Sequence, residues 1–527
     1  MSESGKSSAR GRALRDISRG SFLLGIDQGL NVFFGIIYSV VVLRYLGPEK
    51  FGMLSLSLSV VGIATIGTAN FEAFLERYVA EFKAEGKDGL IVRAHLLIML
   101  LKISLSLIVS GLLFLLAGPI SHSYGMPLMK VLLPIVTLTL ILEALSAANR
   151  ATLYGLQRFG SMVIASGISN SVKVLLLLPV IKSGSGVIGV AWVVVSALVI
   201  SAGLYFGLLW AVLRNLRKKG EAMVGSGGLL RMIFKYCIPL LGARAAYLAG
   251  QNLSRIILGY LLTPHSLGLF SFAFNIIERF IALGQAVPQA ILPSLARLKG
   301  EGDEKGLFSV FSHSHRAISV LASLMSAGIF VFAREITLIM GGREYLDGVL
   351  LLRILAFVPL ARTAQQPLTM LFYALEKTKT VLWLALLKLF LEASLYILFV
   401  PFTGLIGAGF ANLVSVFVTF VQAVVLAGRA VPAGIKESAG GRLAKISVLT
   451  SLQCALIAAL SVPFEFLQLN AAIISLKVVL FPLVFFGCTF ALGLFSKDDV
   501  TFFMTSISGR KIPLRPARGL SKPGESR

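Results

Sequence analysis

Long apolar runs alternate with short polar connections along the whole chain. About 20 apolar residues cross a hydrocarbon core of about 30 Å, and fourteen runs reach or approach that length. We predict spans at 21–44, 52–71, 91–117, 128–149, 160–181, 187–213, 236–261, 266–293, 314–340, 346–374, 380–400, 404–428, 445–464 and 470–495. Because helices satisfy their own backbone hydrogen bonds in lipid, the pattern predicts an all-α polytopic membrane protein of about 14 transmembrane helices.

The polar connections carry a topology signal. If the N-terminus is cytoplasmic, the inner segments and adjoining span ends hold 34 Lys and Arg, whereas the outer loops hold six. Basic residues concentrate on the cytoplasmic side of membrane proteins, and a miscounted span would mix the two sets. The split therefore favours an even number of spans, with both termini cytoplasmic.

Composition and charge agree with a membrane protein. Of the 527 residues, 56% are hydrophobic and 14% charged, and the mean hydropathy is +0.85. The net charge of +24 lies in connecting segments rather than on a polar domain, so we expect no nucleic-acid partner. All three cysteines lie inside apolar runs, so we expect no disulfide framework.

One turn between apolar runs occurs twice. The stretch 45–55 (YLGPEKFGMLS) returns 216 positions later as 261–271 (LLTPHSLGLFS), with Leu, Pro, Gly and Ser in register. Two further pairs follow, 80–86 with 296–302 and 154–158 with 373–377, the second at an offset three residues longer. Both copies of the turn fall on the predicted outer side, so the halves have the same orientation, and parallel repeats place a substrate site at their interface.

The repeat sets the predicted domains. We expect two parallel-repeat six-helix bundles and two additional helices, with basic cytoplasmic segments at the start, between the bundles and at the end. The predicted boundaries are a basic N-terminus at 1–20, an N-terminal bundle at 21–213, a linker at 214–235, a C-terminal bundle at 236–428, two helices at 429–495 and a tail at 496–527.

Ionisable residues inside the spans are the candidate chemistry, because a charge in the bilayer costs a few kcal/mol. The cations are Lys102, Lys173, Arg244, Arg255, Arg279, Arg353, Arg362, Lys388 and Lys477, and the acids are Asp27, Glu143, Glu278 and Glu392. An excess of cations suits a diphosphate, whose oxygens favour charge-assisted contacts with guanidinium groups. The alternative is that most are snorkelled or paired, as Lys388 and Glu392 could be at i, i+4.

From this set we predict a substrate cavity and possible coupling acids. The expected ligands of a diphosphate and its sugars are Arg244, Arg279, Lys173, Lys102, Arg255, Arg362, Asn252 and Gln251. Asp27, Glu278 and Glu143 are candidates for ion coupling, although a helix-face hydrogen bond explains Asp27 equally well. No metal site, cofactor or enzyme is expected, since the five histidines lack metal-ligand spacing and there is no P-loop.

Several motifs together resemble the Wzx-like oligosaccharide flippases, the polysaccharide-export branch of the multidrug/oligosaccharidyl-lipid/polysaccharide flippase superfamily. They are the turn 46–52, the loop 154–159, Pro239, the stretch 286–295 and the element 341–345. The resemblance covers nearly the whole chain. It implies a V-shaped transporter of the inner membrane that moves a polyprenyl-diphosphate-linked oligosaccharide between leaflets by alternating access.

One position departs from that pattern. Ser254 precedes Arg255 where relatives often carry an acid, which puts in doubt any coupling scheme that needs the acid. The resemblance further implies that membrane lipids and glycan polymerase or export machinery are partners.

Three alternatives remain open. A multidrug or organic-cation exporter of the same superfamily would select its cargo with a net negative cavity, which the excess of buried cations opposes. A peptidoglycan-precursor flippase would share the cavity chemistry. A membrane glycan polymerase or ligase would need an extended outer loop, and the predicted outer loops are short.

Overall fold

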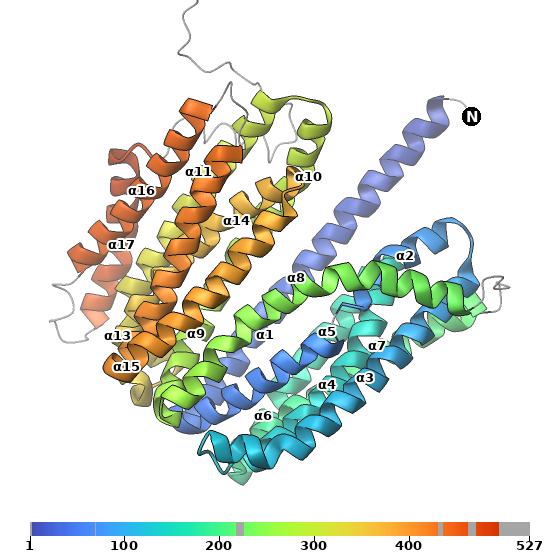
Figure 1. The fold of residues 1–527 in the computed structure, drawn as a ribbon, viewed down its shortest axis with the longest axis horizontal. Helices are drawn as coiled ribbons and strands as arrows, with labels where there is room; N and C mark the ends of the chain where they lie inside the picture. Colours follow the sequence, from blue (N-terminus) through green and yellow to red (C-terminus); the bar gives the residue numbers. More distant parts are fainter. Residues whose placement is uncertain (1–2, 69, 218–225, 431–435, 462–470, 495–527) are drawn as a thin grey trace, which may run out of the picture. The chain divides into compact units, whose positions relative to one another are not determined.

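The computed structural model describes residues 3–68, 70–217, 226–430, 436–461 and 471–494, and within these ranges every regular element is a helix. The elements are α1 (Glu3–Ala64), η1 (Thr65–Thr68), α2 (Glu72–Ala84), α3 (Asp88–Ser123), α4 (Met129–Gly155), α5 (Phe159–Leu175), α6 (Leu177–Ser183), α7 (Gly186–Arg217), α8 (Ser226–Leu261), α9 (Pro264–Gly284), α10 (Ala286–Gly300), α11 (Glu304–Val331), α12 (Ala333–Met340), η2 (Arg343–Gly348), α13 (Val349–Leu355), α14 (Val358–Ala374), α15 (Thr378–Ala430), α16 (Lys436–Ser461) and α17 (Ala471–Ala491) (Figure 1). The predicted tail at 496–527 and part of the predicted linker, 218–225, lie outside the described residues.

Ten of the described helical stretches are long and apolar enough to cross a membrane, or eleven if the bent α8 counts as one span. The predicted all-α multi-pass membrane protein is therefore confirmed. Two of the ten, α1 and α15, each contain two predicted spans, joined at a single non-helical glycine: Gly47 (φ 68°) in α1 and Gly404 (φ 58°) in α15. The total of fourteen and the cytoplasmic termini stay predictions.

Large apolar side chains on the outside of the helices show where lipid would lie. Ile108 and Leu115 on α3 are 68% and 75% exposed, and Phe402 on α15 is 84% exposed. Soluble proteins rarely expose contiguous apolar patches of this kind. A hydrocarbon environment removes that cost, because lipid tails are as apolar as these side chains.

The backbone repeats with the sequence. Left-handed residues occur in pairs: Gly86 with Gly302, Gly125 with Gly342, Gln157 with Glu376, and Gly184 with Gly404. Subtraction of the residue numbers gives offsets between 216 and 220 residues. Positive φ is uncommon outside glycine, so its recurrence at Gln157 and Glu376 is specific. Both halves of the chain therefore turn corners in the same conformation at equivalent places.

The two copies of the repeated turn pack directly against each other. A Cβ added to Gly52 would lie 2.2 Å from the carbonyl oxygen of Pro264, and one added to Gly268 would lie 1.8 Å from that of Pro48. The contact is reciprocal, since Gly52 and Gly268 are equivalent positions of the repeat. Backbone meets backbone here, which only glycine permits. We call this contact the turn–turn closure.

Further bonds from α12 and η2 surround the closure. Nη2 of Arg44 donates to the backbone oxygens of Leu338 and Ile339, at 3.1 Å and 2.7 Å. The Tyr345 hydroxyl, fully buried, donates to the backbone oxygen of Leu43 at 3.4 Å. All of these residues belong to the predicted outer ends of their helices.

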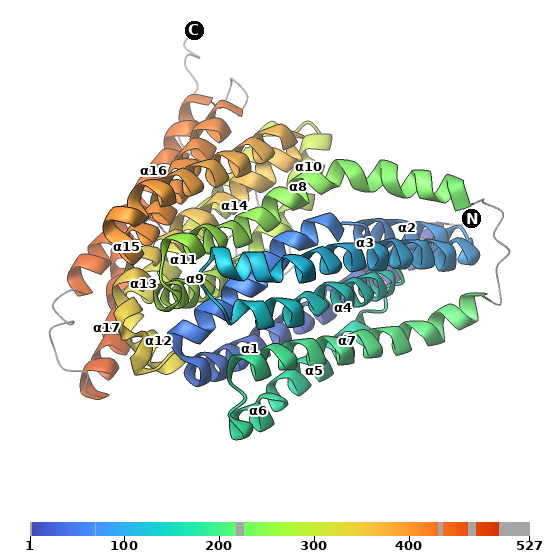
Figure 2. The same ribbon diagram turned by 60° about the horizontal axis from the view of Figure 1, so that its bottom comes forward.

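The chain divides into two compact units. Unit 1 comprises 1–281, 332–358 and 377–422, and unit 2 comprises 282–331, 359–376 and 423–527. In unit 1, α4 packs between α3 and α7, while α1 contacts α5 and α8 (Figures 1 and 2). In unit 2, α11 packs against α10, α16 and α17. The predicted domain boundaries follow the sequence repeat and stay a prediction.

Candidate substrate site

Two basic side chains from different helices converge on one face of α1. Lys173, on α5, places its Nζ 4.0 Å from the centre of the Tyr38 ring. The guanidinium of Arg279, on α9, lies against Gly35, where an added Cβ would be 2.7 Å from its Nη1. Gly35 and Tyr38 are three positions apart and so share a helix face. All four residues belong to unit 1.

Protein groups do not neutralise this cation pair, as we call Lys173 and Arg279. Their positive charges act on one another, and within the described residues neither side chain forms an ion pair or a hydrogen bond with a carboxylate. Charges inside a membrane protein are costly unless they are paired. Phosphate oxygens would supply the missing partners through charge-assisted hydrogen bonds. The cation pair is therefore a candidate anion site.

Arg255, on α8, is held by protein groups instead. Its Nη2 donates to Oδ1 of Asn275 at 2.7 Å, and its Nη1 donates to the backbone oxygen of Gln251 at 3.2 Å. The guanidinium lies 5.1 Å from the centre of the Phe274 ring, and the charge of Glu278 acts on it. Arg255 thus joins α8 to α9, and ion coupling through Glu278 stays a prediction.

The two predicted amide ligands lie on the same helix. Nε2 of Gln251 donates to the Tyr247 hydroxyl at 2.7 Å, and Nδ2 of Asn252 donates to the backbone oxygen of Leu248 at 2.9 Å. Asn252 also fills the space beside Gly62, where an added Cβ would be 2.6 Å from Oδ1. Asn252 therefore contributes to packing between α1 and α8.

Lys102 is neutralised, in contrast to the cation pair. Its Nζ lies 2.5 Å from Oε2 of Glu72, and its side chain is only 5% exposed. Burial alone would raise the pKa of Glu72, but the ammonium of Lys102 and its hydrogen bond hold that pKa below its ordinary value. The charge of Arg244 acts on Glu72 and on Glu76, and the charge of Arg150 acts on Glu76. These five residues form an acid–base cluster.

The predicted coupling acid Asp27 is tied to α5 by neutral groups. Its carboxylate accepts hydrogen bonds from the Ser166 hydroxyl and from Nδ2 of Asn31, the latter at 3.3 Å. The side-chain oxygen of Asn31 in turn accepts from Asn170 at 2.8 Å. At 1.5 Å per residue, Asp27 lies about 16 Å along α1 from Tyr38. It is therefore separate from the cation pair.

Arg150 is a charged residue of this region that the sequence interpretation left out of the site. It lies 3.4 Å from Glu143, with both side chains about half exposed, and the charges of Asp27 and Glu72 also act on it. From the sequence, Arg150 belongs to an inner connection and only marks topology. Arg150 directly follows the predicted span 128–149, and this was the one sequence feature that could have placed it near the membrane-embedded charges.

Glu392, on α15, is a buried acid that accepts hydrogen bonds from four side chains. It is 3% exposed and accepts hydrogen bonds from Lys388 at 2.8 Å, Ser254 at 2.7 Å, Tyr396 at 2.8 Å and Asn412 at 2.7 Å. Four donors fit an ionised carboxylate, which only accepts. The predicted i, i+4 pair of Lys388 and Glu392 is confirmed.

Replacing Lys388 by Met is expected to destabilise the protein by about 3–5 kcal/mol, because it leaves the buried Glu392 charge without its ammonium partner. Thermal unfolding in detergent measures the effect. The double variant Lys388→Met/Glu392→Gln keeps an oxygen acceptor without the charge and should recover most of the loss. A single variant as stable as the wild type would contradict this account of the pair.

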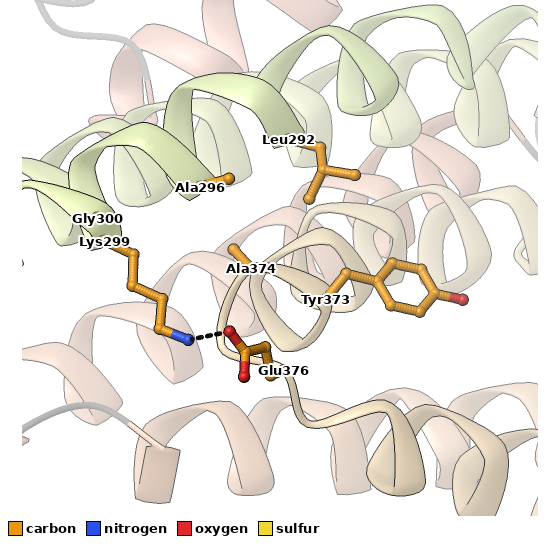
Figure 3. Close-up of a pocket in the computed structure, with 7 residues that line it drawn as sticks. All are labelled: Leu292, Ala296, Lys299, Gly300, Tyr373, Ala374 and Glu376. Carbon is orange, nitrogen blue, oxygen red and sulfur yellow. Dashed lines mark hydrogen bonds and ion pairs between the residues drawn. The ribbon is translucent and has the colours of Figure 1, made fainter. Parts of the chain in front are cut away.

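The predicted ligand Arg362 lies on α14, in unit 2. Unit 2 also has a groove, and none of the predicted substrate ligands lines it. The groove has a volume of about 420 Å³ and is lined by Leu292, Ala296, Lys299, Gly300, Tyr373, Ala374 and Glu376 (Figure 3). Lys299 of α10 and Glu376, which follows α14, form an ion pair of 3.2 Å at its edge. Gly155 is the equivalent of Ala374 in the first half of the sequence repeat, and it packs closely on Val79.

The long apolar helices define a multi-pass, all-α membrane protein. Its sequence matches the family described as "Polysaccharide biosynthesis protein" over residues 41–350, more than half of the chain. The chain belongs to this family. No curated protein sequence matches it significantly.

Solved transporters of the MOP superfamily share the fold. The chain is similar to the lipid II flippase MurJ in an inward closed conformation, with TM-score 0.66, 13% identity, and coverage of 93% of this chain and 99% of that one. It is also similar to an inward-facing MATE family multidrug transporter, with TM-score 0.62, 15% identity, and coverage of 78% and 98%. A MOP superfamily transporter from Pyrococcus furiosus, described as having a binding pocket of reverse polarity, aligns with TM-score 0.52, 16% identity, and coverage of 79% of this chain and 96% of that one.

Proposed function

We propose that the protein is a flippase of the cytoplasmic membrane, which moves a polyprenyl-diphosphate-linked oligosaccharide, such as an O-antigen or exopolysaccharide repeat unit, to the outer leaflet by alternating access. The observation that carries the proposal is the cation pair. Lys173 and Arg279 face α1 without carboxylate partners in the described structure. A diphosphate would supply the missing negative charge.

The family and the fold support a lipid-linked glycan as cargo. The matching family is named for polysaccharide biosynthesis, and the solved structure that aligns with 93% of the chain is a lipid II flippase. Membrane lipids surround the protein on this proposal, and glycan polymerase or export machinery would receive the product. The chain would act as a transporter rather than as an enzyme, with no cofactor.

An organic-cation exporter is the weaker alternative. Such a site should carry net negative charge, whereas the cation pair places two positive charges on one face of α1. Selectivity for a cation would have to overcome their repulsion.

The test is leaflet exchange in vesicles reconstituted with purified protein. A fluorescent polyprenyl-diphosphate sugar on one leaflet should become accessible to a membrane-impermeant quencher on the other, faster than in protein-free vesicles. A lipid II analogue and a fluorescent organic cation are assayed in parallel. Exchange of lipid II alone would assign the peptidoglycan-precursor function, and movement of the cation alone would overturn the proposal.

A further inference from the structure

One helix of unit 2 carries a polar stripe through its buried face. His315, Ser319, Ser323 and Ser326 on α11 are all 0% exposed. Their spacing of i, i+4, i+8 and i+11 places them on one side of a helix. About 16 Å of the α11 axis separates the first from the last at 1.5 Å per residue. The stripe therefore runs through much of the thickness of a span.

Among the four residues of the stripe, Ser323 is the one whose side chain forms a hydrogen bond with another described side chain. Ser323 donates to Oε1 of Gln453 at 3.2 Å, and Nε2 of Gln453 donates to the Thr489 hydroxyl at 2.6 Å. Within the described chain, neither ring nitrogen of His315 has a hydrogen-bond partner of ordinary geometry, and the hydroxyl oxygens of Ser319 and Ser326 have none.

The neighbouring helix α14 contacts the stripe at His315. The backbone of Ala364 approaches the ring of His315, whereas the fully buried Thr363 lies against Gly284 at the end of α9. Phe311 stacks on the other side, with ring centroids 5.9 Å apart. A buried polar group without a partner costs about 1–3 kcal/mol, and internal water normally removes that cost.

Several charged groups lie on α11 and on the helices around it. Arg297 and Lys299 of α10 pair with Glu301 and Glu376, and Lys445 of α16 is exposed. Lys477 of α17 lies one turn from Phe481, which packs on Gly328, about 20 Å along α11 from His315. His313 and Arg316, beside His315 on α11, and Arg362 on α14 each form contacts. Cys454 and Cys488 complete the titratable groups described on α16 and α17.

We infer that His315 is a proton-binding site, reached by water held along Ser319 and Ser326, and that its proton couples transport to a pH gradient. Histidine is the side chain whose charge changes between pH 5 and 8. An ionisable residue buried inside a membrane span is functional by default. One proton binds a ring nitrogen from water and is released to water, so no other reactant is needed. The coupling part rests on the proposed function, whereas proton binding does not.

Proton binding is tested on the full-length wild-type protein in nanodiscs by nitrogen-15 NMR of labelled histidine. The chain has five histidines. Spectra of His95→Gln, His122→Gln, His265→Gln and His313→Gln assign the remaining signal even if His315→Gln fails to fold. The His315 signal should convert from neutral imidazole toward imidazolium as the pH falls from 9 to 4.5. A signal that stays neutral from pH 4.5 to 9 would overturn the proton site.

Coupling is tested by leaflet exchange in vesicles with and without an imposed pH gradient. In the wild type and in His313→Gln, the matched control, the gradient should accelerate exchange of the polyprenyl-diphosphate sugar. In His315→Gln, exchange without a gradient should persist and the acceleration should be lost. An undiminished response in His315→Gln refutes the coupling role. Absence of any exchange in the wild type would instead refute the proposed cargo, while the NMR result still decides the proton site.

Discussion

Replacing Lys173 and Arg279 together by glutamine is expected to reduce exchange of the polyprenyl-diphosphate sugar by at least about 100-fold at subsaturating cargo. Each charge-assisted hydrogen bond contributes about 1.5–3 kcal/mol, and about 1.4 kcal/mol corresponds to a tenfold change in affinity. The two groups are the cations on the α1 face that lack carboxylate partners within the described chain.

Stability separates this effect from misfolding. Because the cation pair has no acid partner, its removal should leave thermal unfolding unchanged or slightly improved, unlike that of Lys388. The double variant Lys130→Gln/Lys182→Gln removes the same charge from two exposed positions and should exchange cargo normally. Normal exchange by the Lys173→Gln/Arg279→Gln protein would exclude the cation pair from cargo binding.

Substituting Gly268 by Ala should open the turn–turn closure. The added Cβ would lie 1.8 Å from the carbonyl oxygen of Pro48, which is backbone and cannot rotate away. Overpacking typically costs about 1–3 kcal/mol, enough to shift a conformational equilibrium by about 10- to 100-fold. The helix ends that carry the two copies of the turn must separate, and Gly52→Ala should have the same effect for the reciprocal reason.

Cysteine labelling measures the opening. In a background without the three native cysteines, Ser271→Cys places a thiol at a position that is 0% exposed and close to the closure. A water-soluble thiol reagent should modify it faster in Gly268→Ala than in the parent. Gly111→Ala, where an added Cβ meets nothing within 4 Å, is the matched control and should label like the parent. Equal labelling of all three would show that the closure tolerates a side chain.

The spans and the repeat could be predicted from the sequence because lipid imposes length and apolarity on every crossing helix. The turn at 45–55 could be recognised because it is repeated. The sequence did not predict that this turn is only a kink at Gly47 inside one continuous helix. A single residue with positive φ is enough to redirect a helix, and hydropathy does not register it. The direct contact between Gly52 and Gly268 is likewise tertiary, although their shared place in the repeat was visible.

Among the candidate charges, sequence distance decided what was predictable. Lys388 and Glu392 are four positions apart, so helix geometry alone predicts their contact. Lys102 and Glu72 are separated by 30 positions, and Glu72 lies just beyond a predicted span, where an acid requires no partner. Their ion pair removes Lys102 from the expected set of free cations. No local pattern could distinguish it from Lys173.

The central claim is that the cation pair binds a diphosphate, and a direct binding measurement tests it. Native mass spectrometry would compare binding of a polyprenyl diphosphate, the matching monophosphate and a zwitterionic phospholipid to the purified protein. We expect the diphosphate to bind most tightly, and to lose this advantage over the monophosphate in the Lys173→Gln/Arg279→Gln variant but not in Lys130→Gln/Lys182→Gln. Equal binding of the three lipids by the wild type, or an undiminished diphosphate preference in the cation-pair variant, would contradict the account.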